Sequence, residues 1–216
     1  MLYIVSTPIG NLEDITLRAI RILKEADYIA AEDTRHSGIL LKKYEIKTPT
    51  LSYHSHSNQG KIERIIELLK DGKSVALISD AGTPGISDPA YSLIQRAIEE
   101  KIQISPIPGA SSALAALVMS GKRMNHFLYL GFLPLKKGRQ TLLKSLAEET
   151  RSIIIFESPH RLLKTLTQIK EFMGDREIAI CREITKIYEE AIRCSVSEAI
   201  EIFTEKKPKG EFVLVV

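Results

Sequence analysis

Short apolar runs alternate with longer amphipathic segments through the first half of the chain, and this alternation constrains the fold most strongly. Strand-like runs occupy residues 2–6, 27–33, 74–79 and 102–109, with a shorter extended segment at 50–55. The segments 12–26, 37–44, 61–73 and 89–101 lie between them and carry helical apolar spacing. Strands that alternate with helices are typical of parallel βαβ units, so we expect an α/β domain with a mainly parallel sheet.

The second half also mixes strands and helices, but its pattern differs. Strand-like runs occupy 127–134, 152–157, 177–182 and 211–216, and helical patterns occupy 162–174 and 197–207. Residues 189–196 partly alternate, which favours an antiparallel strand and therefore a mixed sheet. The polar segment 120–127 follows a helix of small residues, so we expect two α/β domains, 1–120 and 121–216.

Composition places few limits on function. The 216 residues are 44% hydrophobic and 26% charged, as in an ordinary globular protein, and the net charge of +3 permits an acidic partner without requiring one. Cys181 and Cys194 have neither metal-type nor scaffold-type spacing, which fits a reducing cytoplasm. The sequence shows no signal-peptide pattern and no apolar run of about 20 residues, so we expect a cytoplasmic protein without a membrane segment.

Three turns rich in Gly and Pro follow predicted strands: STPIGN at 6–11, SDAGTPGISDP at 79–89 and PIPGASS at 106–112. In a parallel sheet all three lie at the carboxyl edge, where open α/β sheets bind ligands. Any one of them is explained by a plain strand-to-helix turn, but the three together favour a ligand cleft.

The second of these turns does not suit phosphate. It lacks the Gly-Lys-Ser/Thr ending of a P-loop, and it lacks the G-x-G-x-x-G spacing of a dinucleotide fold. It carries Asp80 and Asp88 but no Lys or Arg. Two carboxylates repel an anion, so the turn fits a neutral or cationic ligand that bears hydroxyl groups.

Charged residues follow two other strands. In AAEDTRHS, Glu32 and Asp33 are candidate general bases and Arg35 is a candidate ligand for phosphate or ribose. The alternative is that Asp33 caps the next helix and Arg35 pairs with a carboxylate. In FESPHR, Glu157 and His160 are candidates for the same chemistry, although Ser158 and Pro159 also make an ordinary helix start.

Further candidates stay open. Glu183, His54 and His56 are additional possible bases, and the two histidines have no evident third ligand, so we expect no metal site. Basic clusters occur at Lys136, Lys137 and Arg139 and at 206–209; they are either contacts to RNA phosphates or solvated faces. Phe127, Tyr129 and Phe132 either stack on a base or pack in the core.

Long motifs then occur in a fixed order: TPIGNLEDITLRAI, AAEDTRHS, LSYH, SDAGTPGISDP, PIPGASSALAAL, LGFLP, FESPHR, REITK and KGEFVLVV. From end to end the chain resembles the tetrapyrrole methylase family, in particular its branch that methylates small-subunit ribosomal RNA. The resemblance implies a homodimeric, S-adenosylmethionine-dependent enzyme with the cofactor cleft between its two domains. It implies that the acceptor is a cytidine 2′-hydroxyl of 16S rRNA near the decoding centre, in free RNA or in the 30S subunit.

The resemblance also assigns residues. The cofactor-binding positions it implies are Pro8, Gly10, Asp80, Gly82, Thr83, Pro84, Ile86, Ser111, Ser112, Phe156, Glu157 and Gly210. With it, Glu32, Asp33, Arg35 and His160 are the catalytic candidates and Lys136, Lys137 and Arg139 the RNA-binding candidates. Two rivals remain: a tetrapyrrole C-methylase acting on a precorrin, and a non-catalytic module that binds RNA or a nucleotide.

Overall fold

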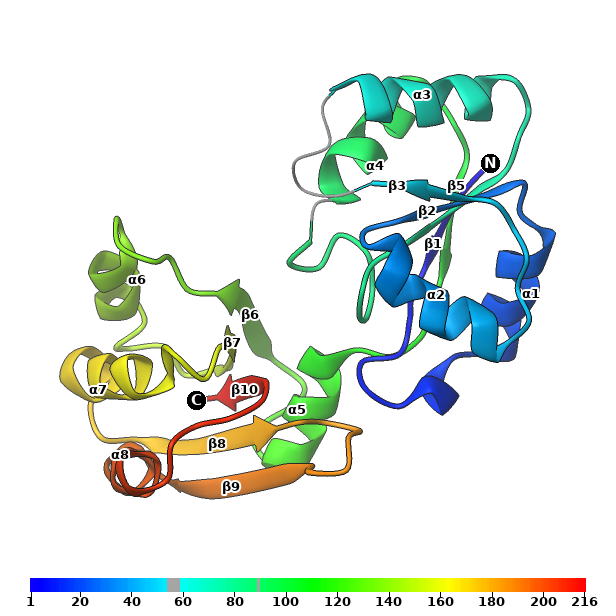
Figure 1. Cartoon of the computed structure of the whole chain (residues 1–216). Helices are drawn as coiled ribbons and strands as arrows, with labels where there is room; N and C mark the ends of the chain where they lie inside the picture. Colours follow the sequence, from blue (N-terminus) through cyan, green and yellow to red (C-terminus); the bar gives the residue numbers. More distant parts are fainter. Residues whose placement is uncertain (54–58, 89) are drawn as a thin grey trace. The chain divides into compact units, whose positions relative to one another are not determined.

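The computed structural model describes residues 1–53, 59–88 and 90–216, and it divides the chain into two compact units, Met1–Ser111 and Ser112–Val216. Each unit is built on one five-stranded sheet with helices on it (Figure 1). The predicted α/β class with two domains is therefore confirmed. Within the part of the chain that the structure describes, no helix is long and apolar enough to cross a membrane.

The first unit has a fully parallel sheet with strand order β3-β2-β4-β1-β5, as the alternation of strands and helices predicts. Its strands are β1 (Leu2–Val5), β2 (Tyr28–Ala31), β3 (Thr50–Ser52), β4 (Val75–Ile78) and β5 (Ile104–Ile107). Its helices are α1 (Leu17–Glu25), α2 (Thr34–Lys43), α3 (Gln59–Lys70) and α4 (Ala90–Glu99), with a 3-10 turn at Leu12–Asp14.

Helices cover both faces of this sheet. Side chains alternate along each strand, so Val5, Ala76 and Ile78 face the cluster formed with α1 and α2, whereas Ile4 and Leu77 face the one formed with α3 and α4. Strands buried on both faces read as continuous apolar runs, which is why the strands of this unit are recognisable in the sequence.

Capping side chains decide where two helices begin. The predicted helix 12–26 is divided, because the Thr16 hydroxyl accepts a hydrogen bond from the Ala19 N–H at 3.1 Å and α1 starts after it. The predicted helix 37–44 begins three residues earlier, at Thr34, because the Asp33 carboxylate accepts the Arg35 N–H at 2.8 Å.

The second unit has the predicted mixed sheet, with strand order β6-β7-β10-β8-β9. β6 and β7 are parallel, whereas β10 is antiparallel to both β7 and β8, and β8 is antiparallel to β9. The strands are β6 (Phe127–Phe132), β7 (Ser152–Glu157), β8 (Glu177–Arg182), β9 (Glu190–Ser195) and β10 (Phe212–Val215). The helices are α5 (Ser112–Ser120), α6 (Arg139–Ser145), α7 (Leu162–Met173) and α8 (Val196–Glu205).

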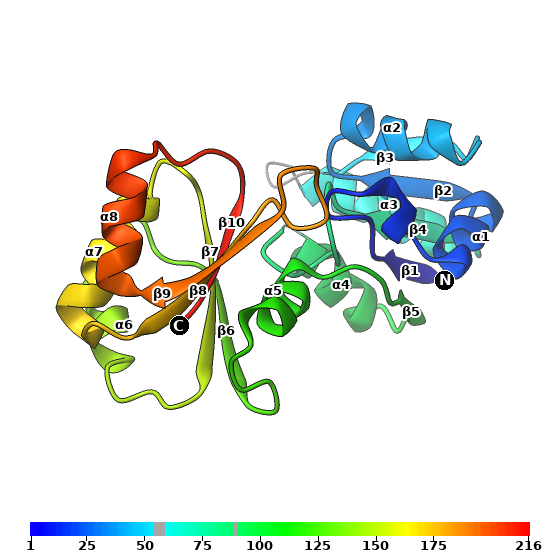
Figure 2. The same cartoon turned by 90° about the horizontal axis from the view of Figure 1, so that it is seen from below.

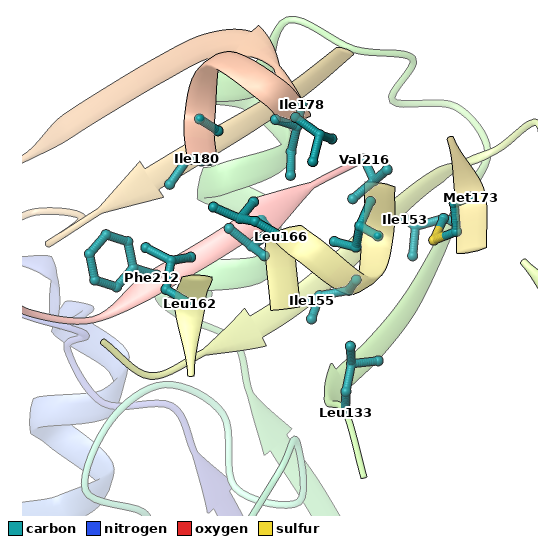
Figure 3. Packing of buried hydrophobic residues seen from close by; sticks show 14 of the residues in the cluster. Leu133, Ile153, Ile155, Leu162, Leu166, Met173, Ile178, Ile180, Phe212 and Val216 are labelled. Carbon is teal, nitrogen blue, oxygen red and sulfur yellow. The ribbon is translucent and has the colours of Figure 1, made fainter. Parts of the chain in front are cut away.

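The main core of the second unit lies between the sheet and helices α6, α7 and α8. Figure 3 shows Leu162 and Leu166 of α7 against Ile155, Ile180 and Phe212 of the sheet. Helix α5 covers the opposite face, as Figure 2 shows, and packs on β8 and β10 through its small buried side chains.

The boundary between the units differs from the predicted one at 120/121. Helix α5 follows the first sheet in the sequence, but it packs on the second sheet, so the division falls between Ser111 and Ser112. The Arg193 guanidinium of β9 also donates to the carbonyl oxygens of Met119 and Ser120 at the end of α5. Periodicity alone does not tell which of two sheets a small-residue helix covers.

Candidate active site

The turns at the carboxyl edge of the first sheet are tied together. Thr7 and Gly82 exchange two main-chain hydrogen bonds, from the Thr7 N–H at 2.9 Å and from the Gly82 N–H at 3.1 Å. The Ser6 and Thr83 hydroxyl oxygens lie 2.8 Å apart. Gly109 of the third turn comes so close that a Cβ there would lie 2.8 Å from the Ser6 Cβ. The three turns that the sequence predicts at this edge are therefore neighbours.

The turn after β4 is shaped by its own residues. Gly82 and Gly85 adopt φ values of 77° and 94°, which only glycine adopts without strain. The Asp88 carboxylate accepts the Gly85 N–H at 2.7 Å and the Ala90 N–H at 3.0 Å, so it closes the turn and caps α4. Asp88 therefore has a structural role in addition to its charge.

Glu32 and Asp80 link the ends of β2 and β4. The Asp80 carboxylate accepts the Asp33 N–H at 3.1 Å, and the Glu32 carboxylate accepts the Asp80 N–H at 3.5 Å. Burial raises the pKa of Glu32, and the charges of Asp80 and Asp88 raise it further against the opposing hydrogen bond. Glu32 also borders two hollows, an open one with Ser52 and Asp33 and a narrow one with Tyr53 and Pro84.

The pKa of the adjacent Asp33 is shifted in the opposite direction. Its carboxylate caps α2 and pairs with the Arg35 guanidinium at 2.9 Å, and the hydrogen bonds from Arg35 lower the pKa of Asp33 to about 2. The Arg35 side chain is 90% exposed. A carboxylate held ionised in this way is a weak proton acceptor, so of this pair Glu32 is the better candidate base.

In the second unit, Glu157 ends β7 and is fully buried in a polar network. Its carboxylate accepts the Thr165 hydroxyl at 2.5 Å and the Ser158 N–H at 2.8 Å, and it lies 3.3 Å from the Arg161 guanidinium. Thr165 in turn accepts a hydrogen bond from Arg139 at 2.6 Å. Glu157 thus anchors the predicted FESPHR turn to α7 and does not face solvent.

Arg139 is not available to RNA in this structure, which corrects the sequence-based expectation. It is 3% exposed, and it donates to the Gln168 side chain at 2.7 Å and to the Pro134 carbonyl at 3.1 Å. Burial, together with the charge of Arg161, lowers the pKa of the Arg139 guanidinium. The neighbouring Lys136 and Lys137 are exposed, as an RNA contact requires.

The remaining predicted residues of the second unit lie at the same edge of its sheet. Phe156 is half-buried, and its ring makes edge contacts with Tyr129 and Phe132 at centroid distances of 5.4 and 5.6 Å. Gly210 precedes β10 and adopts a φ of 91°; a Cβ there would lie 2.6 Å from the Glu183 side chain.

Glu183 accepts the Glu211 N–H at 2.9 Å and pairs with Lys186 at 3.1 Å. It is therefore engaged in holding this loop. His160 is exposed, and the residues that the structure describes give its ring no hydrogen bond. His54, His56 and Pro89 lie outside the described residues.

The other predicted cofactor positions differ in exposure. Pro8 and Pro84 are buried, Gly10 and Ile86 are exposed, and Ser111 and Ser112 are half-buried on either side of the unit boundary. No group of three potential metal ligands occurs among residues 1–53, 59–88 and 90–216.

Sequence reasoning missed the side chains that organise these edges, above all Thr7 and Thr165. Thr165 carries a signal, since it is a polar residue on the α7 face that otherwise buries Leu162, Leu166 and Ile169. Thr7 carries none, because a threonine in a turn has many ordinary explanations.

Comparisons with known proteins agree with this architecture. The family model described as Tetrapyrrole (Corrin/Porphyrin) Methylases matches residues 1–200. A protein of Thermotoga maritima named ribosomal RNA small subunit methyltransferase I is 51% identical, over 99% of this chain and 96% of that protein. Its namesake in Synechocystis sp. is 50% identical, over 100% of this chain and 78% of that protein.

Solved structures support the fold. A cobalt precorrin-4 methyltransferase matches with a TM-score of 0.74 and 19% identity, over 99% of this chain and 93% of that one. A diphthine synthase matches with a TM-score of 0.73 and 15% identity, over 100% of this chain and 88% of that one. The chain therefore belongs to the tetrapyrrole methylase family of methyltransferases and, within it, to the group of ribosomal RNA small subunit methyltransferases I.

Proposed function

We propose that the protein transfers a methyl group from S-adenosylmethionine to the ribose 2′-hydroxyl of a cytidine in 16S rRNA, near the decoding centre. The observation that carries the reaction class is the acidic, hydroxyl-lined edge of the first sheet, where Glu32, Asp80 and Asp88 meet without a Lys or Arg in the turn after β4. The RNA acceptor rests on the full-length similarity to relatives that bear that name.

The residues present fit the proposed cofactor. S-adenosylmethionine bears a sulfonium cation, an ammonium group and ribose hydroxyls, for which carboxylates and main-chain carbonyls are suitable partners. Asp80 offers its carboxylate at this edge, and Gly82, Thr83 and Gly109 bring the main chain of two turns close together. When bound, the cofactor supplies an electrophilic methyl group.

Glu32 is the residue to which we assign proton transfer. Its pKa is raised, which makes its carboxylate a better proton acceptor than that of Asp33, and it lies at the open hollow beside Ser52. With cofactor and RNA bound, the Glu32 carboxylate would take the proton of the 2′-hydroxyl as its oxygen bonds the methyl carbon, and the bond from that carbon to the sulfonium sulfur would break to leave a neutral thioether. The Glu32→Gln variant is expected to lose roughly 10²–10⁴-fold in kcat.

The other assigned residues have supporting roles. Asp33 fixes the start of α2 and the adjacent Arg35, whose exposed guanidinium is suited to a phosphate or ribose oxygen. His160, Lys136 and Lys137 are exposed candidates for RNA contact. Phe156, Glu157 and Gly210 are assigned to cofactor binding by family resemblance. The homodimer and the cytoplasmic location are likewise proposed from that resemblance.

The decisive experiment uses labelled S-adenosylmethionine and 30S subunits that lack the modification, with naked 16S rRNA in parallel. Labelled 2′-O-methylcytidine at a single position is the expected result, and the faster of the two acceptors identifies the substrate. Cofactor binding by calorimetry without transfer to either RNA would contradict the proposal. A precorrin would then be the next acceptor to test, since the fold is shared with a precorrin methyltransferase.

A further inference from the structure

A further hollow lies within the second unit, at the end of the sheet opposite to Phe156 and Glu157. Ser152 begins β7 and Glu177 begins β8, and both line the hollow, whereas Glu157 and Arg182 end these strands. Its volume is about 390 Å³. Three separate segments supply its charged lining, which consists of Lys122, Arg123, Glu149, Arg151, Arg176 and Glu177. We call this the basic hollow.

Main-chain carbonyls hold two of its cations in place. The Lys122 ammonium donates to the Glu177 carbonyl at 2.6 Å, and the Arg176 guanidinium donates to the Met173 and Ala147 carbonyls at 3.1 and 2.6 Å. A carbonyl oxygen orients a cation without cancelling its charge. Lys122 and Arg176 are therefore positioned in advance while their charges stay largely uncompensated.

The acidic residues of the hollow do not neutralise this charge. Glu149 forms a two-pronged pair with Arg151, at 2.9 and 2.6 Å, so these two charges cancel each other. Glu177 is exposed, and its charge opposes only part of the pKa change at Lys122. Burial lowers the pKa of the Lys122 ammonium, and the charge of Arg176 lowers it further. An anion placed among these groups would stabilise the charged form of Lys122 and so oppose both effects on its pKa.

Arg123 supplies the accessible donor. Its main chain is fixed because the Ser152 hydroxyl donates to the Arg123 carbonyl at 2.7 Å. Its side chain is exposed, and across the described parts of the chain no hydrogen bond or ion pair engages its guanidinium. An arginine of this kind can bind two oxygens of a phosphate at once.

We propose that the basic hollow binds a backbone phosphate of the RNA substrate, with Arg123, Lys122 and Arg176 as its donors. The site rests on the proposed function, because a phosphodiester is the anion that an RNA acceptor presents. It lies at the opposite end of this sheet from Phe156 and Glu157, which are assigned to the cofactor, so we assign it to RNA positioning and not to the chemistry. It reads no base, and its contribution is the same for every RNA sequence.

The test compares Arg123→Glu with Lys164→Glu, a change of equal charge at an exposed residue of α7 that we place in no site. Binding of a labelled small-subunit rRNA fragment is titrated at several salt concentrations. Arg123→Glu is expected to weaken binding about three- to tenfold near physiological salt and to reduce the salt slope by roughly 0.7–0.9. Lys164→Glu is expected to match the wild type, and equal effects of the two variants would overturn the proposal.

A methyl-transfer assay separates this proposal from the proposed function. Arg123→Glu is expected to raise KM for RNA and leave kcat unchanged, because a distant phosphate contact contributes equally to ground and transition states. If the wild type methylates rRNA and Arg123→Glu behaves like it, only the basic hollow is wrong. If the wild type methylates no rRNA while Arg123→Glu alone loses binding, only the assigned acceptor is wrong.

Discussion

Glu32 and Asp33 are adjacent carboxyl groups whose pKa values move in opposite directions. Burial and two neighbouring carboxylates raise the pKa of Glu32 above its ordinary value of 4.5, whereas hydrogen bonds from Arg35 lower that of Asp33 from 3.8 to about 2. The motif AAEDTRHS predicts that both are functional candidates but does not tell which one is buried. The end of β2 decides this, since it directs Glu32 toward Asp80 and Asp33 toward α2.

This difference predicts opposite effects on stability. The raised pKa of Glu32 means that the folded state binds more protons, so its ionisation costs stability as pH rises above 4.5. Glu32→Gln is therefore expected to raise the free energy of unfolding at neutral pH and to have little effect at acid pH below that value. This gain in stability would accompany the loss of turnover, because residues that serve catalysis are often destabilising in the folded state.

Asp33→Asn serves as the control of opposite sign. The lowered pKa stabilises the folded state above 3.8, and this contribution disappears as pH falls toward about 2. The variant is expected to lose stability at neutral pH and to approach the wild type in acid. Urea unfolding of both variants across this pH range checks the pair, and a shift of the same sign in both would contradict it.

The buried Thr165 hydroxyl links two charged side chains, so its removal tests the polar network. Thr165→Val keeps the shape but removes one hydrogen bond from Arg139 and one from Glu157, whose other partners remain. We expect a loss of about 1–3 kcal/mol in urea unfolding. Thr167→Val on the same helix removes an exposed hydroxyl that donates to the Leu163 carbonyl, and its stability is expected to stay within about 0.5 kcal/mol of the wild type. Equal losses in the two variants would mean that the network contributes nothing.

At the scale of elements, the sequence predicts the strands and helices well, because strand and helix periods differ and most segments are strongly patterned. The sequence predicts where the motif loops lie along the chain, but it does not predict which residues of different loops contact each other. The exchange of hydrogen bonds between Thr7 and Gly82, and the approach of Gly109 to Ser6, depend on strand order β4-β1-β5, which no local pattern specifies. The same limit explains why the sequence predicts an RNA contact for Arg139, since two of its buried partners, Thr165 and Gln168, come from α7.

The close approach of two turns gives a prediction for Gly109. Gly109→Ala places a Cβ 2.8 Å from the Ser6 Cβ, so the turns after β1 and β5 must move apart. We expect a loss of about 1–3 kcal/mol in stability, as for other overpacked sites, and weaker binding of S-adenosylmethionine by calorimetry. Gly38→Ala in α2 meets no atom within 4 Å and is expected to gain about 0.5–1 kcal/mol with unchanged binding. Unchanged cofactor affinity in Gly109→Ala would remove these turns from the cofactor site.

At the scale of the whole molecule, the two units have separate cores and sheets of different construction. Composition and pattern predict this division, but they place the boundary nine residues too late because α5 directly follows β5, as the next helix of an alternating strand-helix pattern would. This helix belongs to the second unit because it packs on β8 and β10, whose residues lie more than fifty positions further along the chain.

The position of β10 bears on how the chain acquires its structure during synthesis. In the first unit the central strands β4 and β1 are complete once residue 78 has been made, and the edge strand β5 follows. In the second unit β10 lies between β7 and β8. The two halves of this sheet, β6-β7 and β8-β9, therefore cannot be joined until residues 212–215 have left the ribosome. The first unit is therefore expected to mature while translation continues, whereas in the second the pairs β6-β7 and β8-β9 each expose one open strand edge, on β7 and on β8, until β10 arrives.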